Sequence, residues 1–424
     1  MTSTETSSSS LAETDFAVDS RQVATVGQAF TAYGNRIRGG DMGALPAVLG
    51  LIVLFVVFSL ASSSFLTALN MANLITQAGA ICVLAMGLVP VLLMGDIDLS
   101  AGVAGAVAAA IAALAIRDQG LPWYVAVLAA VVAGMVIGLA IGLLVAKVGI
   151  PSFVVTLAFF LALQGVTLRL IGQGGSVRVD DPVIRGLTIT NVPVLAGWVV
   201  AVVIVVGFAA LTLLRYRSQV ARDLQHQPLG VIALKIAGMA VIVLGVTAVL
   251  SVNRSRNPNF PIEGVPYVLP LVALLLIFWT FVLTRTRYGR HVYAVGGNRE
   301  AARRAGINVD RIRISVFVIG SSMAAISGII AASNAGSVSP SSGAGNTLLY
   351  AVGAAVIGGT SLFGGKGQAR DAVIGGVVIA TIANGLGLLN QASYINFLVT
   401  GAVLLLAAGV DAVSRRRRSA SGLG

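Results

Sequence analysis

Long apolar stretches separated by short polar breaks fill the chain from residue 45 onward. Their usual length, about 20 residues, lets an α-helix cross the ~30 Å hydrocarbon core of a bilayer, where only helices and closed barrels satisfy their own backbone groups. The pattern therefore predicts an all-α, polytopic transmembrane helical bundle of about 12 spans. The candidate spans are 45–62, 74–94, 99–116, 121–146, 150–171, 192–214, 230–252, 265–283, 314–332, 347–363, 372–390 and 393–411.

Polar segments at both ends divide the chain into three parts. Residues 1–44 open with MTSTETSSSS and stay polar, which indicates a flexible cytoplasmic tail and not a signal peptide. We expect residues 45–414 to form the transmembrane domain, and 415–424 to form a basic cytoplasmic tail whose four arginines contact anionic lipid. The weakest spans are 99–116, which is short, and 230–252, which carries a lysine that must extend to the membrane surface.

Composition supports a membrane protein and excludes several other classes. The chain is 57% hydrophobic and 10% charged, whereas soluble domains carry about 25% charged residues. Its 50 glycines suit helices that pack closely in lipid. The net charge of +12 lies beside the spans, so we expect contact with the lipid bilayer and not with nucleic acid. Cys82 is the only cysteine, which excludes an internal disulfide.

The lysines and arginines are divided unevenly between the two sets of loops. If the N-terminus is cytoplasmic, the tails and even-numbered loops hold 21 of the 28, the outer loops hold six, and Lys235 lies within a span. Because these residues accumulate on the cytoplasmic side, both termini are expected inside a multi-pass cell membrane protein. The loop at 284–313 carries eight of them and is the most basic.

This basic loop contains the signals for a short helix outside the bilayer. Asn298 suits an N-cap, Glu300 falls in the first turn where the helix dipole favours an anion, and Gly306 suits a C-cap. A helix at about 298–306 is too short to be stable alone in water. It therefore needs a surface to pack against, either the membrane interface or another protein.

Small side chains favour the second alternative. Ala301, Ala302 and Ala305 would give the helix a small-residue surface that fits a groove, with the arginines at its rim. We therefore expect a docking element for a partner protein. A solvated helix that only orients the chain is the other interpretation.

The chain lacks an energy source of its own. Carriers driven by ions place ionisable residues at membrane depth, but here only Asp96, Asp98 and Asp411 stand near the ends of spans. The stretch GGTSLFGGKGQ is not a phosphate-binding loop, because Thr360 occupies the position of the first glycine and Gly367 follows the lysine. Energy must enter from elsewhere, and the docking helix is the candidate point of entry.

The sequence also argues against an enzyme that hydrolyses bonds within the membrane. A Ser/His mechanism needs a histidine within hydrogen-bond reach of the nucleophile, and the only two histidines, His226 and His291, lie in predicted cytoplasmic loops. We expect a transport subunit without hydrolytic activity.

Two polar, glycine-rich breaks are candidates for a gate or pathway. GDIDLS and GGTSLFGG can be aligned as G-x-x-x-L-x-x-G, and paired glycine breaks often mark a pathway at a repeat interface. For Asp98 with Ser100, the alternative is a simple cap on the helix that follows. The candidate gate or pathway residues are Asp96, Asp98, Ser100, Gly358, Gly359 and Gly365. Polar side chains within spans could also line a route, although such side chains more often bridge helices.

Four segments of the chain resemble a known family. Glu300-Ala301-Ala302 followed by Gly306 resembles the E-A-A-x-x-x-G signature of permease subunits of ABC importers. MGDIDLSAG, YGRHVYAVGGNREAARRAGINV, GSVSPSSGAGN and VIGGTSLFGGKG are similar to segments of the ribose- and xylose-type sugar permeases. The extra length around 174–260 is most similar to the xylose-type members.

The resemblance implies a set of partners and a substrate class. It implies a cytoplasmic ATP-binding subunit that docks on Asn298, Glu300, Ala301, Ala302 and Gly306 and uses ATP and Mg, with no cofactor in this chain. It also implies an extracytoplasmic sugar-binding protein, a second copy of this permease, and import of a simple sugar, a pentose such as xylose. Leu348-Leu349-Tyr350 replaces the acidic triplet common in the family, which weakens the transfer of substrate identity. A stand-alone secondary carrier or channel for a small polar solute is the alternative function.

Overall fold

The structure is a computed structural model with two separately described units. It describes Gly27, Thr31, Gly34 and residues 43–420, except 223, 225, 256 and 258. Contacts divide the chain into one unit of Met1–Asp41 with Leu195–Val249 and another of Met42–Val194 with Leu250–Gly424. The predicted tail at 1–44 and the last four residues thus lie almost entirely outside the described residues.

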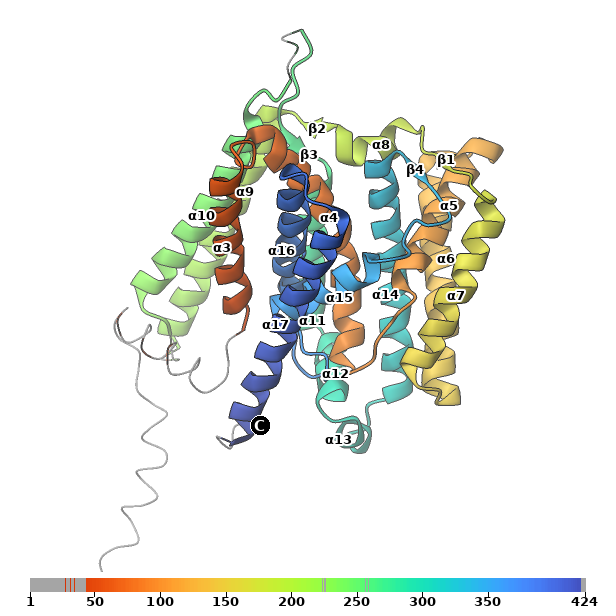
Figure 1. The fold of residues 1–424 in the computed structure, drawn as a ribbon. Helices are drawn as coiled ribbons and strands as arrows, with labels where there is room; N and C mark the ends of the chain where they lie inside the picture. Colours follow the sequence, from red (N-terminus) through yellow and green to blue (C-terminus); the bar gives the residue numbers. More distant parts are fainter. Residues whose placement is uncertain are drawn as a thin grey trace, which may run out of the picture. The chain divides into compact units, whose positions relative to one another are not determined.

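Each of the twelve predicted spans corresponds to a helix in the described part of the chain (Figure 1). Nine helices there are long and apolar enough to cross a membrane, which confirms the polytopic all-α class. The helices are α3 (Leu45–Ala61), α4 (Ala68–Leu93), α5 (Ala101–Gln119), α6 (Trp123–Leu143), α7 (Ser152–Ile171), α9 (Val194–Val220), α10 (Leu229–Ser251), α11 (Val268–Arg285), α14 (Val309–Ala335), α15 (Thr347–Gly358), α16 (Ala369–Leu388) and α17 (Ser393–Ala420).

Short elements connect several of these helices. Two strand pairs are antiparallel, β1 (Val177–Arg178) with β4 (Ser337–Val338) and β2 (Asn191–Val192) with β3 (Val265–Pro266). A π-helical turn, η1 (Leu144–Val148), continues α6. The remaining short helices are α8 (Pro182–Ile189), α12 (Arg287–Gly297) and α13 (Arg299–Arg304).

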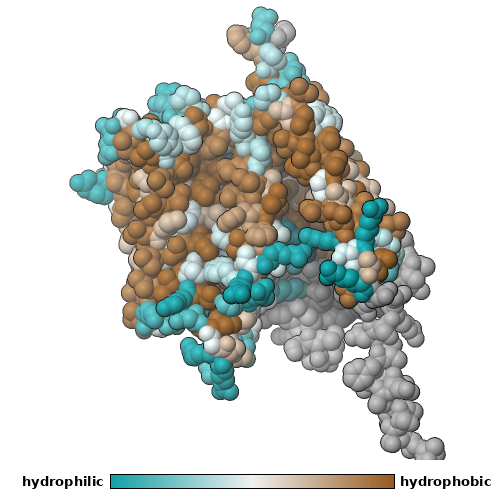
Figure 2. All heavy atoms as spheres, turned by 180° about the vertical axis from the view of Figure 1, so that it is seen from behind, coloured by the Kyte–Doolittle hydropathy of each residue, from teal (hydrophilic) through white to brown (hydrophobic). Residues whose placement is uncertain are grey.

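The surface of the protein shows how the chain meets lipid. Figure 2 shows apolar side chains over most of one face, with hydrophilic side chains gathered toward its two ends. On α6, the large apolar side chains of Leu128, Val132 and Val136 are exposed. In water such a continuous apolar surface would be unfavourable, so this face fits the hydrocarbon core of a bilayer.

The core of the larger unit is built around the antiparallel pair α4 and α14. Ser327 donates a hydrogen bond to the carbonyl of Ala80 at 2.7 Å, and further along the pair Gly87 lies against Gly320 and Met323. Residue numbers rise along one helix as they fall along the other. Small residues let these backbones approach, as is usual for helices in membranes.

Polar side chains within the spans bridge helices, as their usual role predicts. Asn70 on α4 and Asn384 on α16 exchange two amide hydrogen bonds of 2.9 and 3.0 Å, and Asn384 also reaches Gln77 at 3.5 Å. In the smaller unit, the amine of Lys235 extends back to Gln227 at 2.6 Å, just before the start of α10. This geometry agrees with the expected extension of the lysine toward the membrane surface.

Two helices of the larger unit start halfway along the α4–α14 pair. Gly105, in the second turn of α5, contacts Ala324 and Gly328 near the middle of α14. Gly343, shortly before α15, contacts Gly102 at the same level. α15 has 12 residues, which at 1.5 Å per residue is about 18 Å, roughly half of a bilayer crossing. The predicted full span at 347–363 is therefore a half-length helix, and residues 359–363 belong to the break that follows it.

Candidate functional site

The docking segment comprises α12 and α13, residues 287–304. Asn298 is the N-cap of α13 as predicted, whereas the C-cap is Ala305 and the predicted Gly306 follows it. The side chain of Asn298 accepts a hydrogen bond from the backbone N–H of Ala301 at 2.9 Å. Gly306 has φ +81, a left-handed conformation that favours glycine, and its N–H donates to the carbonyl of Arg303 at 3.0 Å. Glu300 lies in the first turn and pairs with Arg304 at 3.2 Å.

The orientation of α13 corrects one expectation from the sequence. The side chain of Ala302 is 3% exposed and packs into the main hydrophobic core of the chain, so in this structure a partner cannot reach it. Ala301 and Ala305 are exposed instead. Six residues cannot show helical periodicity clearly, and for this reason the sequence did not separate the inner alanine from the two outer ones.

The arginines of the loop at 284–313 were expected at the rim of the docking surface, and the structure corrects this expectation for two of them. Two of them bind Asp96, in the segment between α4 and α5. Arg313 makes a bidentate pair with Asp96 through contacts of 2.6 and 2.7 Å, and Arg299 approaches the same carboxylate at 3.4 Å. Arg299 also donates to the carbonyl of Met94 at 2.5 Å, and Arg313 to that of Val145 at 3.1 Å.

In this conformation Asp96 is buried and held by two arginines. Its side chain is 4% exposed, against 17% for Arg313 and 42% for Arg299. A buried carboxylate is tolerated when such partners neutralise it. The sequence placed Asp96 near a membrane boundary but contained no signal for its partners, more than 200 residues away.

Asp98 and Ser100 form a local hydrogen-bonded turn just before α5, and Ser100, the N-cap residue of α5, makes no side-chain cap bond to the helix. One carboxylate oxygen of Asp98 accepts from the backbone N–H of Ser100 at 2.9 Å and from its hydroxyl at 2.6 Å. These contacts stabilise the start of α5. The other oxygen, Oδ2, is buried and has no hydrogen-bond partner among the described residues.

The second glycine-rich break, residues 359–368, lies against the first. The N–H of Gly365 donates to the carbonyl of Leu93 at 2.9 Å, and a side chain on Gly358 would overlap the backbone of Asp371. Gly359 has φ +119 and Gly365 φ +72, conformations that other residues rarely adopt. The positions aligned as a repeat in the sequence are therefore neighbours at one end of the unit, not equivalents at opposite ends.

The docking segment is also tied to this second break through a residue that sequence reasoning missed. The hydroxyl of Tyr293 donates to the carbonyl of Gly367 at 2.6 Å. On the same helix, Tyr288 lies 2.9 Å from the hydroxyl of Ser315, and burial raises the pKa of Tyr288 to about 12. A phenol with that pKa stays neutral at physiological pH and keeps its donor hydrogen. No sequence signal marks these contacts, because tyrosines beside a membrane are common.

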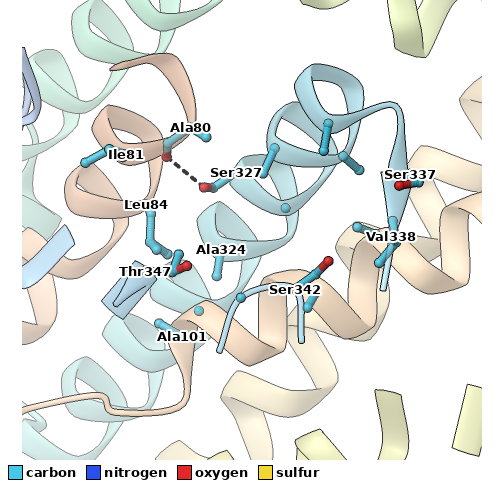
Figure 3. Close-up of a pocket in the computed structure, with 18 residues that line it drawn as sticks. Ala80, Ile81, Leu84, Ala101, Ala324, Ser327, Ser337, Val338, Ser342 and Thr347 are labelled. Carbon is cyan, nitrogen blue, oxygen red and sulfur yellow. Dashed lines mark hydrogen bonds between the residues drawn. The ribbon is translucent and has the colours of Figure 1, made fainter. Parts of the chain in front are cut away.

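A cavity of about 170 Å³ lies where α5 and α15 begin, halfway along the α4–α14 pair. Figure 3 shows Ala101 at the start of α5 and Thr347 at the start of α15 on one side, with Ala324 and Ser327 of α14 nearby. The lining is mostly alanine and glycine. Of the four hydroxyl side chains that line it, Ser327, Ser342 and Thr347 already make hydrogen bonds within the chain, so the cavity offers few free donors and acceptors for tight sugar binding. Its small side chains suit movement of the surrounding helices.

The break that mirrors the α4–α5 segment is therefore the loop at 336–346. Each long helix of the central pair is followed by an irregular segment and then by a helix that begins halfway. Because α4 and α14 are antiparallel, the two arrangements run in opposite directions, as inverted repeats of transporters do. The sequence pointed to a paired break but selected the wrong partner for the first one, since only GGTSLFGG shared its glycine spacing.

Comparisons with known proteins agree with this architecture. A family model described as "Branched-chain amino acid transport system / permease component" matches residues 70–408. The xylose transport system permease protein XylH of Haemophilus influenzae is 34% identical over 374 residues, covering 87% of this chain and 96% of its own. The ribose import permease protein RbsC of Escherichia coli K12 is 32% identical over 369 residues, covering 86% and 92%. RbsC of Bacillus subtilis is 32% identical over 381 residues, covering 90% and 95%.

No solved structure matches the chain. The family match covers most of the transmembrane domain, from the start of α4 into α17. The many apolar helices and the relatives named as permeases lead to one conclusion. The chain is an integral membrane protein and belongs to the family of permease components of transport systems.

Proposed function

We propose that this chain is the membrane-spanning subunit of an ATP-driven importer of a simple sugar, with a pentose such as xylose as the substrate. The observation that carries the proposal is the likeness to xylose and ribose permeases along nearly their whole length, at 32 to 35% identity. The xylose-type relatives are the more similar of the two groups. A stand-alone carrier or channel is less favoured, because the relatives are components of transport systems.

The partners follow from the same proposal. A separate cytoplasmic subunit binds ATP and Mg and docks on the exposed side of α13, where Ala301 and Ala305 lie. An extracytoplasmic binding protein delivers the sugar, and a second copy of the permease completes the transmembrane part. The docking segment supports this division of labour, since it is anchored to two glycine-rich breaks and still presents small side chains outward.

We also propose that both termini and the docking segment face the cytoplasm. In a Cys82→Ala background, Gln119→Cys, at the exposed end of α5, should react with a membrane-impermeant thiol reagent from outside intact cells. Arg303→Cys, on α13, should react only after the cells are opened. Labelling of Arg303→Cys in intact cells would reverse the orientation and remove the basis for cytoplasmic docking.

Transport of labelled sugar tests the main proposal. Cells without other xylose uptake should gain ATP-dependent uptake when this chain is expressed with the ATP-binding and sugar-binding subunits of its own system. Omitting the ATP-binding subunit should abolish the uptake, whereas a stand-alone carrier would continue to work. Competition by unlabelled ribose, xylose and other simple sugars then identifies the preferred substrate. Uptake that persists without the ATP-binding subunit would establish the carrier alternative.

A further inference from the structure

Asp96 is the point where the docking segment meets the transmembrane helices. Its carboxylate holds Arg299 of α13 and Arg313 of α14 at once. The same two arginines also bind the carbonyls that end α4, at Met94, and lie in η1, at Val145. The cluster of Asp96 and the two arginines therefore joins α13 and α14 to the end of α4 and to η1.

The contact between Asp96 and the two arginines depends on the negative charge of the one carboxylate. Two guanidinium groups face one carboxylate, and Asp96 is the only anion that forms an ion pair with either of them among the described residues. Without it, two like charges would remain close together in a partly buried site, where electrostatic repulsion is poorly screened. An asparagine at position 96 keeps the size and shape of the side chain but removes the charge.

From Asp96 an irregular segment, residues 96–100, leads to the start of α5 and is held by hydrogen bonds. The N–H of Ile97 donates to the hydroxyl of Ser152 at 3.3 Å, and the hydroxyl of Thr156 donates to the carbonyl of Ile97 at 3.2 Å. Asp98 then holds Ser100, the residue directly before α5, through two hydrogen bonds. The segment is thus fixed to α7 at Ile97 and to the start of α5 at Asp98.

The start of α5 in turn borders the cavity and the opposite half-way helix. Gly102 is in backbone contact with Gly343, in the loop that leads into α15. Ala101, Gly102 and Gly343 all line the cavity. A displacement of α13 therefore has a continuous path, through packed and hydrogen-bonded groups, to the place where both half-way helices begin.

We propose that Asp96 is a positioning residue that transmits movement of the docking segment to the start of α5, and so couples ATP hydrolysis to sugar passage. This inference rests on the proposed function and adds the route of coupling within the chain. Asp96 contacts neither sugar nor nucleotide in this scheme. It acts through Arg299, Arg313 and the segment at 96–100 that leads into α5.

The test measures coupling in the complete transporter reconstituted with its ATP-binding and sugar-binding subunits. Asp96→Asn should leave assembly intact but lower the sugar transported per ATP hydrolysed by roughly tenfold. The matched control is Asp310→Asn, which breaks the exposed pair of Asp310 with Lys147, 3.1 Å long, at the beginning of α14. The control should couple as the unaltered protein does.

A double-mutant cycle identifies the partner of Asp96. If the two residues act through each other, Asp96→Asn combined with Arg313→Gln should couple no worse than either single variant. Arg299→Gln breaks only the partly exposed arm of the cluster and should lower the same ratio without loss of assembly. It provides the test should Asp96→Asn fail to insert.

The outcomes separate this inference from the proposed function. If the unaltered complex shows no ATP-dependent uptake, the proposed function fails. If it transports sugar and Asp96→Asn lowers only the amount of complex, with the ratio unchanged, the carboxylate is merely structural and the inference is wrong. Normal coupling by Arg299→Gln, or fully additive losses in the double variant, would overturn it as well.

Discussion

Replacing Ala301 by glutamate should abolish both sugar uptake and co-purification of the ATP-binding subunit, while the permease still inserts into the membrane. Ala301 is exposed on α13, and its backbone N–H is held by the Asn298 cap regardless of its side chain. A glutamate there would place a bulky charge in the proposed interface without a partner. Such a buried, unpaired charge costs several kcal/mol, enough to prevent docking.

Two variants make this experiment decisive. Arg304→Ala removes an exposed side chain that pairs with Glu300 on the same helix, and surface pairs of this kind contribute under about 1 kcal/mol, so its uptake should stay close to normal. Ala302→Glu is the less informative choice, because Ala302 is buried within the chain and the substitution would disturb the permease itself. Full uptake by Ala301→Glu with the ATP-binding subunit still bound would show that this side of α13 is not the docking surface.

Replacing Gly328 by alanine should sharply reduce the amount of folded permease. A β-carbon on Gly328 would overlap the carbonyl group of Gly105, so that α5 and α14 could not keep their present separation. Overpacking costs about 1–3 kcal/mol even where side chains can shift, and here the obstacle is backbone. We expect a loss of about 3 kcal/mol or more, measured as a lower unfolding temperature in detergent and a lower yield of monodisperse protein.

Gly165 provides the matched control for this substitution. It lies within α7, and no atom beyond its own helix stands within 4 Å of the position that a β-carbon would take. Because alanine favours helices over glycine by about 1 kcal/mol, Gly165→Ala should be neutral or slightly stabilising. Equal yields and unfolding temperatures for the two variants would contradict the close contact between α5 and α14.

The sequence by itself was enough to predict features that depend on local chemistry. Apolar runs predicted a helix at each of twelve places, and nine helices in the described part of the chain are long enough to cross a bilayer. The N-cap of α13 and the glycine just after its C-cap could be predicted as well, because Asn298 and Gly306 satisfy backbone groups only a few residues away. The sequence also suggested a cap role for Asp98, which instead bonds Ser100, the residue directly before α5.

Tertiary structure decided the features that join distant segments. Asn70 and Asn384 are hydrogen-bonded partners although they are 314 positions apart in the sequence, and Asp96 and Arg313 are 217 positions apart. No local sequence pattern connects such partners. The sequence did not reveal that α15 ends at Gly358, because the residues of the break at 359–363 include glycine and apolar side chains that also occur within membrane spans. Burial of Ala302 depends on the neighbours that α13 packs against. Local hydrogen bonds and the length of an apolar run can be read from neighbouring residues in the sequence. Long-range side-chain partners and the burial of a given side chain are decided only when the helices pack together.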